Sequence, residues 1–157
     1  MSSSRPPIAG AIKPRAVLVG GVVDLFGTIM AGFVLMNAYA ITRIAGGALT
    51  LEDLERNGGL DFLQMYLGDS LVLVANLLLG LLMTAVGGYV AARLAGGVLP
   101  LFHGLLAGVA SLVGGFVFFG GGGGAELPGW MLVLGYLLHL PAAVLGGWWR
   151  RGKIPVR

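Results

Sequence analysis

Long stretches without charged residues dominate the polar and apolar pattern of this chain. Arg15 and Arg43 enclose 27 residues with a single charge, and three later stretches of 23, 32 and 23 residues carry none. A helix that crosses a bilayer needs about 20 mainly apolar residues, and in lipid only helices and closed barrels satisfy their own backbone hydrogen bonds. Because the stretches lack the strict alternation of barrel strands, the pattern predicts an all-α integral membrane protein, a four-helix bundle. The predicted spans are residues 16–40, 70–92, 99–119 and 130–149.

These spans divide the chain into a tail, 1–15, a transmembrane domain, 16–149, and a basic tail, 150–157. Eight of the ten Lys and Arg residues fall in the tails or beside the connection after the second span, on one side of the predicted membrane. Loops rich in Lys and Arg stay in the cytoplasm. The charges therefore predict a multi-pass protein with both termini inside, in the cytoplasm, and with the lipid bilayer as its first partner.

The long outer loop, 43–69, carries five of the seven acidic residues and a pattern of its own. Thr50 and Asp53 have the spacing of a capping box, and 57–59 (Asn-Gly-Gly) is a plausible helix stop. The leucines and aromatic residues of 60–67 share one face, which favours a short helix in the outer membrane interface. The alternative is a solvated connector that its acids keep outside. In the last loop, 120–124 is expected to be a flexible glycine turn, because it lacks the Lys and Ser/Thr of a phosphate-binding loop.

Composition narrows the classes of function. The chain is 57% hydrophobic and 11% charged, with 29 glycines and no cysteine. A soluble domain carries about 25% charged residues, so a conventional soluble enzyme is excluded, as are disulfide scaffolds and cysteine-ligated cofactors. No cofactor is expected. The chain has no basic patch with interleaved aromatic residues, so nucleic acid is not an expected partner.

Small residues recur every fourth position in each predicted span and place a narrow stripe on one helix face. Lipid does not drive helices together, so small residues that allow close backbone approach supply the packing. The stripes predict glycine-rich packing faces, which could bind the other spans, a second copy or another membrane protein. The glycines chosen for this role are Gly20, Gly32, Gly80, Gly88, Gly108, Gly115, Gly135 and Gly147.

The same stripes hold nearly all polar residues of the spans. At 1.5 Å per residue from the inner boundary, Asp24 lies roughly 12 Å deep, Thr84 about 13 Å, His139 about 15 Å and Ser111 about 16 Å. An ionisable group at this depth is costly without a partner and is a candidate functional site. We therefore expect Asp24 and His139 to form a hydrogen-bonded or ion pair, with Thr84 and Ser111 satisfying their remaining groups. The alternative is that Asp24 is an inert packing device bound to neighbouring hydroxyls.

Other polar residues have simpler interpretations. His139 alone could serve structure, because Pro141 frees a backbone carbonyl that needs a donor. His103 lies nearer the cytoplasmic edge, where it could reach interfacial water, and Asn76 lies toward the outside. Two histidines and one acid on three helices lack the spacing of metal ligands, so no metal site is predicted.

Two resemblances rest on short segments. Residues 87–93 (GGYVAAR) and 103–108 (HGLLAG) resemble uncharacterised small bacterial four-helix inner-membrane proteins. The resemblance implies the fold and a location in a bacterial inner (cytoplasmic) membrane, but no activity. Residues 24–28 (DLFGT) are similar to the first helix of small multidrug-resistance transporters. In that family a Glu at the place of Asp24 is shared between a proton and a cationic drug.

The sequence favours a non-enzymatic accessory, assembly or scaffold protein, whose helix faces bind itself or another membrane subunit. No catalytic residues are assigned, because no nucleophile and base stand at a suitable spacing. The alternative is a proton-coupled small-solute transporter or ion pathway that uses Asp24 and His139.

Overall fold

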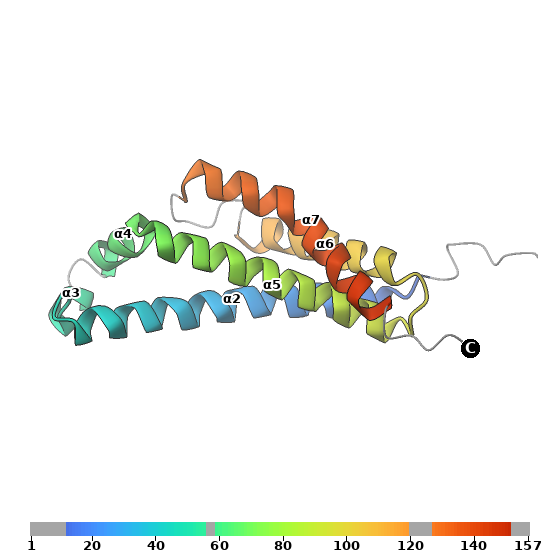
Figure 1. Cartoon of the computed structure of the whole chain (residues 1–157), viewed down its shortest axis with the longest axis horizontal. Coiled ribbons are helices and arrows are strands. Elements are labelled where there is room, and N and C mark those ends of the chain that lie inside the picture. The colour runs from blue at the N-terminus through green and yellow to red at the C-terminus, as the bar shows by residue number, and fades with distance from the viewer. Residues whose placement is uncertain (1–11, 56–58, 120–126, 152–157) are drawn as a thin grey trace, which may run out of the picture.

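The computed structural model describes residues 12–55, 59–119 and 127–151, and this part of the chain is helical throughout its regular elements. Four helices are long and apolar enough to cross a membrane, which confirms the predicted helical chain with four candidate spans. They are α2 (Pro14–Ala45), α5 (Ser70–Leu94), α6 (Pro100–Phe119) and α7 (Gly129–Arg151). Two short helices, α3 (Leu51–Glu55) and α4 (Leu60–Gly68), lie between α2 and α5 (Figure 1).

The helix α2 is longer than the predicted span 16–40. Its 32 residues extend about 48 Å, more than the roughly 30 Å hydrocarbon core of a bilayer. It begins with Pro14, where a missing backbone N–H costs nothing. It continues past residue 40 because Arg43 has partners there: its guanidinium lies 4.8 Å from the centre of the Tyr39 ring and 2.9 Å from Asp69 Oδ2.

The two short helices follow α2, and α4 packs beside the last turns of α2. The expected capping box is present, with Thr50 N donating to Asp53 Oδ2 at 2.9 Å and Asp53 N donating to Thr50 Oγ1 at 3.2 Å. The predicted stop at 57–59 falls mostly outside the described residues. Tyr66 of α4 is buried against Tyr39 of α2, with ring centroids 5.5 Å apart. Asp69 then caps α5 by accepting from Leu71 N at 3.1 Å.

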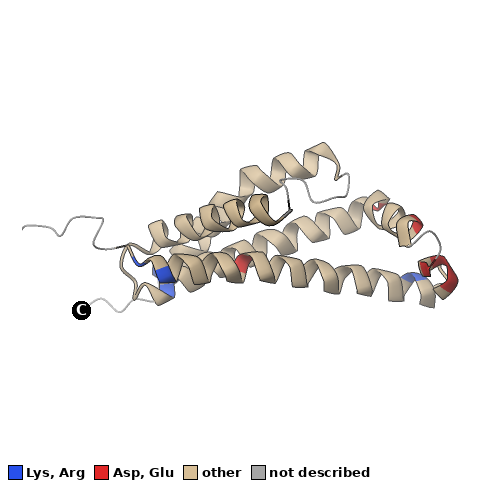
Figure 2. Cartoon of the chain, turned by 180° about the vertical axis from the view of Figure 1, so that it is seen from behind, with Lys and Arg blue, Asp and Glu red and all other residues tan. Residues whose placement is uncertain are grey.

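The remaining boundaries differ slightly from expectation. The helix α7 extends to Arg151, two residues into the predicted basic tail, and it contains Pro141. The predicted glycine turn at 120–124 lies outside the described residues. We call the end of the bundle with the start of α2 and the end of α7 the terminal end, and the end with α3 and α4 the loop end. Figure 2 shows most Lys and Arg of the described chain at the terminal end and most Asp and Glu at the loop end, where Arg43 pairs with Asp69.

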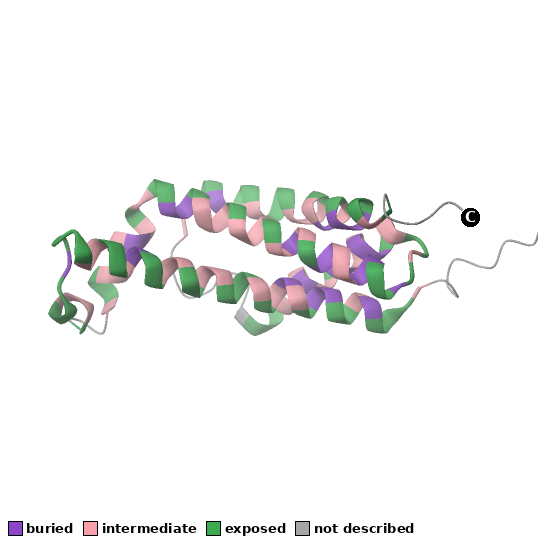
Figure 3. Ribbon diagram, turned by 60° about the horizontal axis from the view of Figure 1, so that its bottom comes forward, coloured by how far each residue is buried: buried purple, intermediate pink, exposed green. Residues whose placement is uncertain are grey.

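The four long helices alternate in direction along the chain. The helices α5 and α6 each contact all three other long helices. In contrast, α2 and α7 lie on opposite sides of α5 and α6 and make few direct contacts with each other. Buried positions gather toward the terminal end (Figure 3). In Figure 1, α7 leans away from α2 toward the loop end. The bundle is therefore tight at one end and open between its helices at the other.

Glycines account for the tight end. A Cβ at Gly20 would lie 2.7 Å from Gly87 O, and one at Gly104 would lie 2.6 Å from Ala143 O. Toward the loop end the spacing relaxes: a Cβ at Gly80 would meet Thr28 Cγ2 at 3.7 Å, an ordinary contact. The helix backbones therefore touch near the terminal end and are held apart by side chains near the loop end.

Candidate functional site

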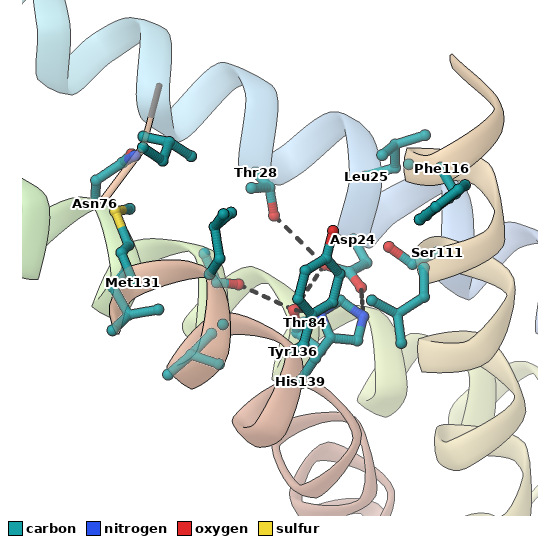
Figure 4. Close-up of a pocket in the computed structure, with 18 residues that line it drawn as sticks. Asp24, Leu25, Thr28, Asn76, Thr84, Ser111, Phe116, Met131, Tyr136 and His139 are labelled. Atoms are coloured by element: carbon teal, nitrogen blue, oxygen red, sulfur yellow. Dashed lines mark hydrogen bonds and ion pairs between the residues drawn. The ribbon is translucent and has the colours of Figure 1, made fainter. Parts of the chain in front are cut away.

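A cavity of about 370 Å³ lies among the four long helices, in the looser part of the bundle. Its lining is mostly aliphatic and aromatic, and it extends from Asp24 toward Leu127 and Met131. Figure 4 shows Asp24 of α2, Thr84 of α5 and His139 of α7 close together within this lining. We call these three residues the pair site.

Asp24 is only 2% exposed, and glycine makes its position possible. A Cβ at Gly87 would lie 2.7 Å from Asp24 Cβ and 2.6 Å from Gly20 O, so any larger residue at 87 would displace α2. The close approach of α2 and α5 carries the carboxylate into the interior. A carboxylate in such a place is costly unless other groups hold its charge.

Two hydroxyls serve one oxygen of this carboxylate. Thr84 Oγ1 lies 2.9 Å from Asp24 Oδ1, and Thr28 Oγ1 lies 3.4 Å from the same atom. Thr84 Oγ1 is also 3.0 Å from the carbonyl oxygen of Gly80, one turn earlier in α5. Thr28 is one turn after Asp24 in α2, which places both side chains on one face.

His139 reaches across the gap between α7 and α2. Its Nε2 lies 3.3 Å from Asp24 Oδ2 and 3.2 Å from the carbonyl oxygen of Gly108 in α6. Its Nδ1 lies 3.4 Å from Thr84 Oγ1. The contact with Asp24 lacks hydrogen-bond geometry, so Oδ2 has no hydrogen-bond partner among the described residues. The structure thus brings the acid and the imidazole together with one carboxylate oxygen left unserved.

Only one of the two predicted hydrogen-bond partners of the Asp24–His139 pair, Thr84, contacts the pair. Ser111 is 5% exposed and lines the same cavity, but no hydrogen bond links it to Asp24, Thr84 or His139 within the described chain. The expectation that Ser111 completes the pair is therefore wrong, and the Gly108 carbonyl takes its place. Asn76 lines the cavity nearer the loop end.

Pro141 does not explain His139. Its missing N–H frees the carbonyl four residues earlier on α7, yet the imidazole bonds to Gly108 on α6 instead. Two partners at the site were not predicted from the sequence, the backbone carbonyls of Gly80 and Gly108. The order of side chains along a sequence does not predict which backbone carbonyl will face another group. Thr28, by contrast, stands four residues from Asp24, and that spacing was available as a signal.

His103 lies outside the cavity and is completely buried, contrary to the expectation that it reaches interfacial water. Its Nε2 accepts from Lys13 N at 3.0 Å, and its Nδ1 lies 3.1 Å from Leu99 O. A ring nitrogen that accepts from a backbone N–H carries no proton, so His103 is neutral with hydrogen on Nδ1. It ties the start of α2 to the start of α6 and holds the carbonyl of Leu99, whose φ is an unusual 45°.

Few charged groups of the described chain face the cavity. Among the described lining residues, Asp24, His139 and Tyr136 have ionisable side chains, and none is a Lys or Arg. No group of three His, Asp or Glu side chains in the described ranges could share a metal ion. Comparisons with family models, curated proteins and solved structures found no match to the chain. The site is therefore interpreted from its own geometry.

Proposed function

We propose that this protein is a proton-coupled transporter of a small solute, with both termini on the cytoplasmic side of a cytoplasmic membrane. The observation that carries the proposal is the cavity of about 370 Å³ that reaches a buried carboxylate paired with an imidazole. Pockets for small molecules are concave and mostly apolar, with a few convergent polar groups. Buried ionisable groups within a membrane bundle mark substrate or proton pathways by default.

The incomplete hydrogen bonding of Asp24 favours this role over an inert packing device. A buried acid that serves only packing is stable when both of its oxygens accept hydrogen bonds. Here Oδ1 is bonded to hydroxyls, whereas Oδ2 has no hydrogen-bond partner in the described chain and lies 3.3 Å from the His139 imidazole, in poor geometry for a hydrogen bond. An oxygen in this state is ready to take up a proton or to accept a donor from a bound molecule.

The packing supports access from one side. Glycine contacts bring the helix backbones together between the pair site and the terminal end, and the cavity extends in the other direction. With the basic terminal end in the cytoplasm, the cavity faces the outside. This corresponds to one of the two states that a transporter must visit, and the tight glycine contacts form its closed side.

The same contacts weigh against the scaffold role that the sequence favoured. Gly88 lies against Ala143, and Gly147 against Pro100 and Leu101, so these glycine faces are used inside the chain. A scaffold does not need an internal cavity that ends at a carboxylate.

Access to the cavity can be tested by cysteine labelling, because the chain has no cysteine of its own. Ser111→Cys places a thiol in the cavity, and Val113→Cys, two residues on, places one on a face that is 58% exposed in the isolated chain and turned to lipid. A charged, water-soluble thiol reagent added from outside should label Ser111→Cys much faster than Val113→Cys. Equal rates would contradict a water-filled cavity.

Transport is tested in liposomes that carry a pH gradient. Uptake of a library of small organic cations, acids and neutral compounds is compared between wild type and Asp24→Asn. We expect gradient-driven uptake of at least one compound, lost in Asp24→Asn and kept in Thr42→Val, whose hydroxyl lies on α2 outside the cavity. Uptake of no library member, or uptake that survives Asp24→Asn, contradicts the proposal.

A further inference from the structure

The Thr84 hydroxyl stands between the two titratable groups of the pair site. Its Oγ1 is 2.9 Å from Asp24 Oδ1 and 3.4 Å from His139 Nδ1, and the residue is 2% exposed. A hydroxyl donates one hydrogen and accepts on its lone pairs. It can therefore accept from the imidazole and donate to the carboxylate at the same time.

The ring of His139 shows which of its nitrogens exchanges a proton with this hydroxyl. Nε2 faces two acceptors, the Gly108 carbonyl at 3.2 Å and Asp24 Oδ2 at 3.3 Å. A carbonyl oxygen only accepts, so Nε2 carries a hydrogen in both charge states of the ring. The nitrogen that gains and loses a proton is Nδ1, which faces Thr84.

The direct contact between acid and imidazole is a poorer path. Asp24 Oδ2 and His139 Nε2 are 3.3 Å apart but do not meet hydrogen-bond geometry, because the Nε2 hydrogen is directed to Gly108. Hydrogen bonds weaken steeply as they depart from linearity. Both links through Thr84 satisfy hydrogen-bond geometry, and the bond from Thr84 to Asp24 is the shortest contact of the pair site.

A third acceptor gives the hydroxyl a way to break the link. Thr84 Oγ1 lies 3.0 Å from Gly80 O, nearly as close as it lies to Asp24 Oδ1. Because the hydroxyl has a single hydrogen, it serves one of these oxygens at a time. Rotation toward Gly80 removes the Thr84 donor from Asp24 Oδ1, leaves that oxygen with the weaker bond from Thr28, and disconnects it from His139. Gly80, Thr84 and Asp24 all line the cavity, so a bound solute lies beside the hydroxyl and both of its acceptors.

We propose that Thr84 is the proton bridge between His139 and Asp24, an inference that rests on the proton-coupled function above. When His139 gives its Nδ1 proton to Thr84 Oγ1, the hydrogen of the hydroxyl passes to Asp24 Oδ1. Asp24 is then a neutral carboxylic acid, His139 is a neutral imidazole with hydrogen on Nε2, and Thr84 again has one hydrogen. The reverse transfer restores the carboxylate and the imidazolium, so the proton and charge balance without another reactant.

The test compares three substitutions in the full-length protein. Thr84→Val removes the hydroxyl at nearly constant volume, and Thr84→Ser keeps it. Thr42→Val is the matched control on α2, because the Thr42 hydroxyl donates to Tyr39 O at 2.8 Å and lies outside the cavity. Folding of each variant is checked by circular dichroism, and Thr84→Ala replaces Thr84→Val if the latter does not fold.

The readout is time-resolved infrared spectroscopy after a rapid pH jump. The carbonyl band of Asp24, assigned by its loss in Asp24→Asn, is followed together with the ring bands of His139. In wild type, Thr84→Ser and Thr42→Val, we expect the Asp24 and His139 bands to change with one shared time constant. In Thr84→Val the two changes should have different time constants, and gradient-driven uptake should fall at least about a hundredfold, at the low end of what a positioned proton-transfer group contributes.

The outcomes distinguish this inference from the proposed function. A shared time constant that survives removal of the hydroxyl, or that Thr84→Ser fails to restore, overturns the bridge. If the changes depend on Thr84 but no compound is taken up, the bridge stands and the transporter proposal fails. If uptake depends on Asp24 and ignores Thr84, the transporter proposal stands and the bridge fails.

Discussion

Gly146 on α7 is the position where the packing of the bundle can be tested most sharply. A Cβ there would overlap the carbonyl oxygen of Ala85 and would lie 2.8 Å from both Ala85 C and Tyr89 N. These are backbone atoms of α5, which cannot turn aside as a flexible side chain can. Gly146→Ala must therefore push α7 away from α5.

The expected loss can be worked out from two opposing terms. Overpacking a close contact costs about 1–3 kcal/mol, and a clash with backbone belongs at the upper end. Replacing Gly by Ala in a helix gains up to about 1 kcal/mol from intrinsic propensity. The net loss is about 2 kcal/mol, roughly a 30-fold change in the folding equilibrium. Gly135→Ala is the matched control on the same helix, because its Cβ would meet Leu77 Cδ1 at 3.9 Å, an ordinary contact. Only the propensity gain remains there.

The assay is reversible unfolding in mixed detergent micelles, followed by helical circular dichroism. Gly146→Ala should be about 3 kcal/mol less stable than Gly135→Ala, because the first substitution loses about 2 kcal/mol and the second gains up to about 1 kcal/mol. If Gly146→Ala unfolds no more readily than Gly135→Ala, the backbones of α5 and α7 do not touch at this point. Glycine contacts between α5 and α7 would then not close the terminal end of the bundle.

Three further predictions concern polar groups. His139→Leu should lower the free energy of unfolding by about 3 kcal/mol, because it leaves the buried Asp24 without its partner. Adding Asp24→Asn should recover at least half of that loss in the same unfolding assay. A double variant as unstable as the single one contradicts the pairing. Burial raises the pKa of Asp69, but hydrogen bonds from the backbone N–H groups of Val72 and Leu71 and the charge of Arg43 outweigh it, so the pKa lies below its ordinary value of 3.8. A lowered pKa contributes stability above the unfolded value that is lost as the pH falls through the folded value, so the thermal midpoint of wild type should drop between pH 6 and pH 3 by more than that of Asp69→Asn. His103→Phe should cost about 1–3 kcal/mol by leaving the Lys13 N–H unpaired and should speed hydrogen exchange of that amide, whereas an unchanged exchange rate would show that the imidazole does not hold it.

Much of the architecture follows from one-dimensional pattern. Uncharged stretches of sufficient length predict four spans because lipid cannot hydrogen-bond an open backbone, and the structure has four such helices. The polar layer followed from spacing and a fixed rise per residue, which correctly placed Asp24, Thr84 and His139 within reach of one another. The capping box of Thr50 and Asp53 is local, so its contacts depend on three residues of chain.

The failures share a cause. Ser111 lines the same cavity as Asp24, but spacing along the chain does not state how far a helix is rotated. The rotation of α6 presents the carbonyl of Gly108 to His139 instead of the serine hydroxyl. His103 was expected in water because it lies near a helix end. Its burial depends on the start of α2 folding back over it, a contact between residues 90 positions apart.

The sequence alone therefore determined the number of candidate spans, the local caps and which polar side chains share a level. Hydrophobicity, helix periodicity and short-range hydrogen bonds are properties of neighbouring residues. Only the tertiary structure decided that the bundle closes at one end and opens at the other, and that Asp24 keeps one oxygen without a hydrogen bond. Those features depend on distances between helices. These distances are set by contacts between residues far apart in the chain, such as Gly20 with Gly87 and Gly146 with Ala85.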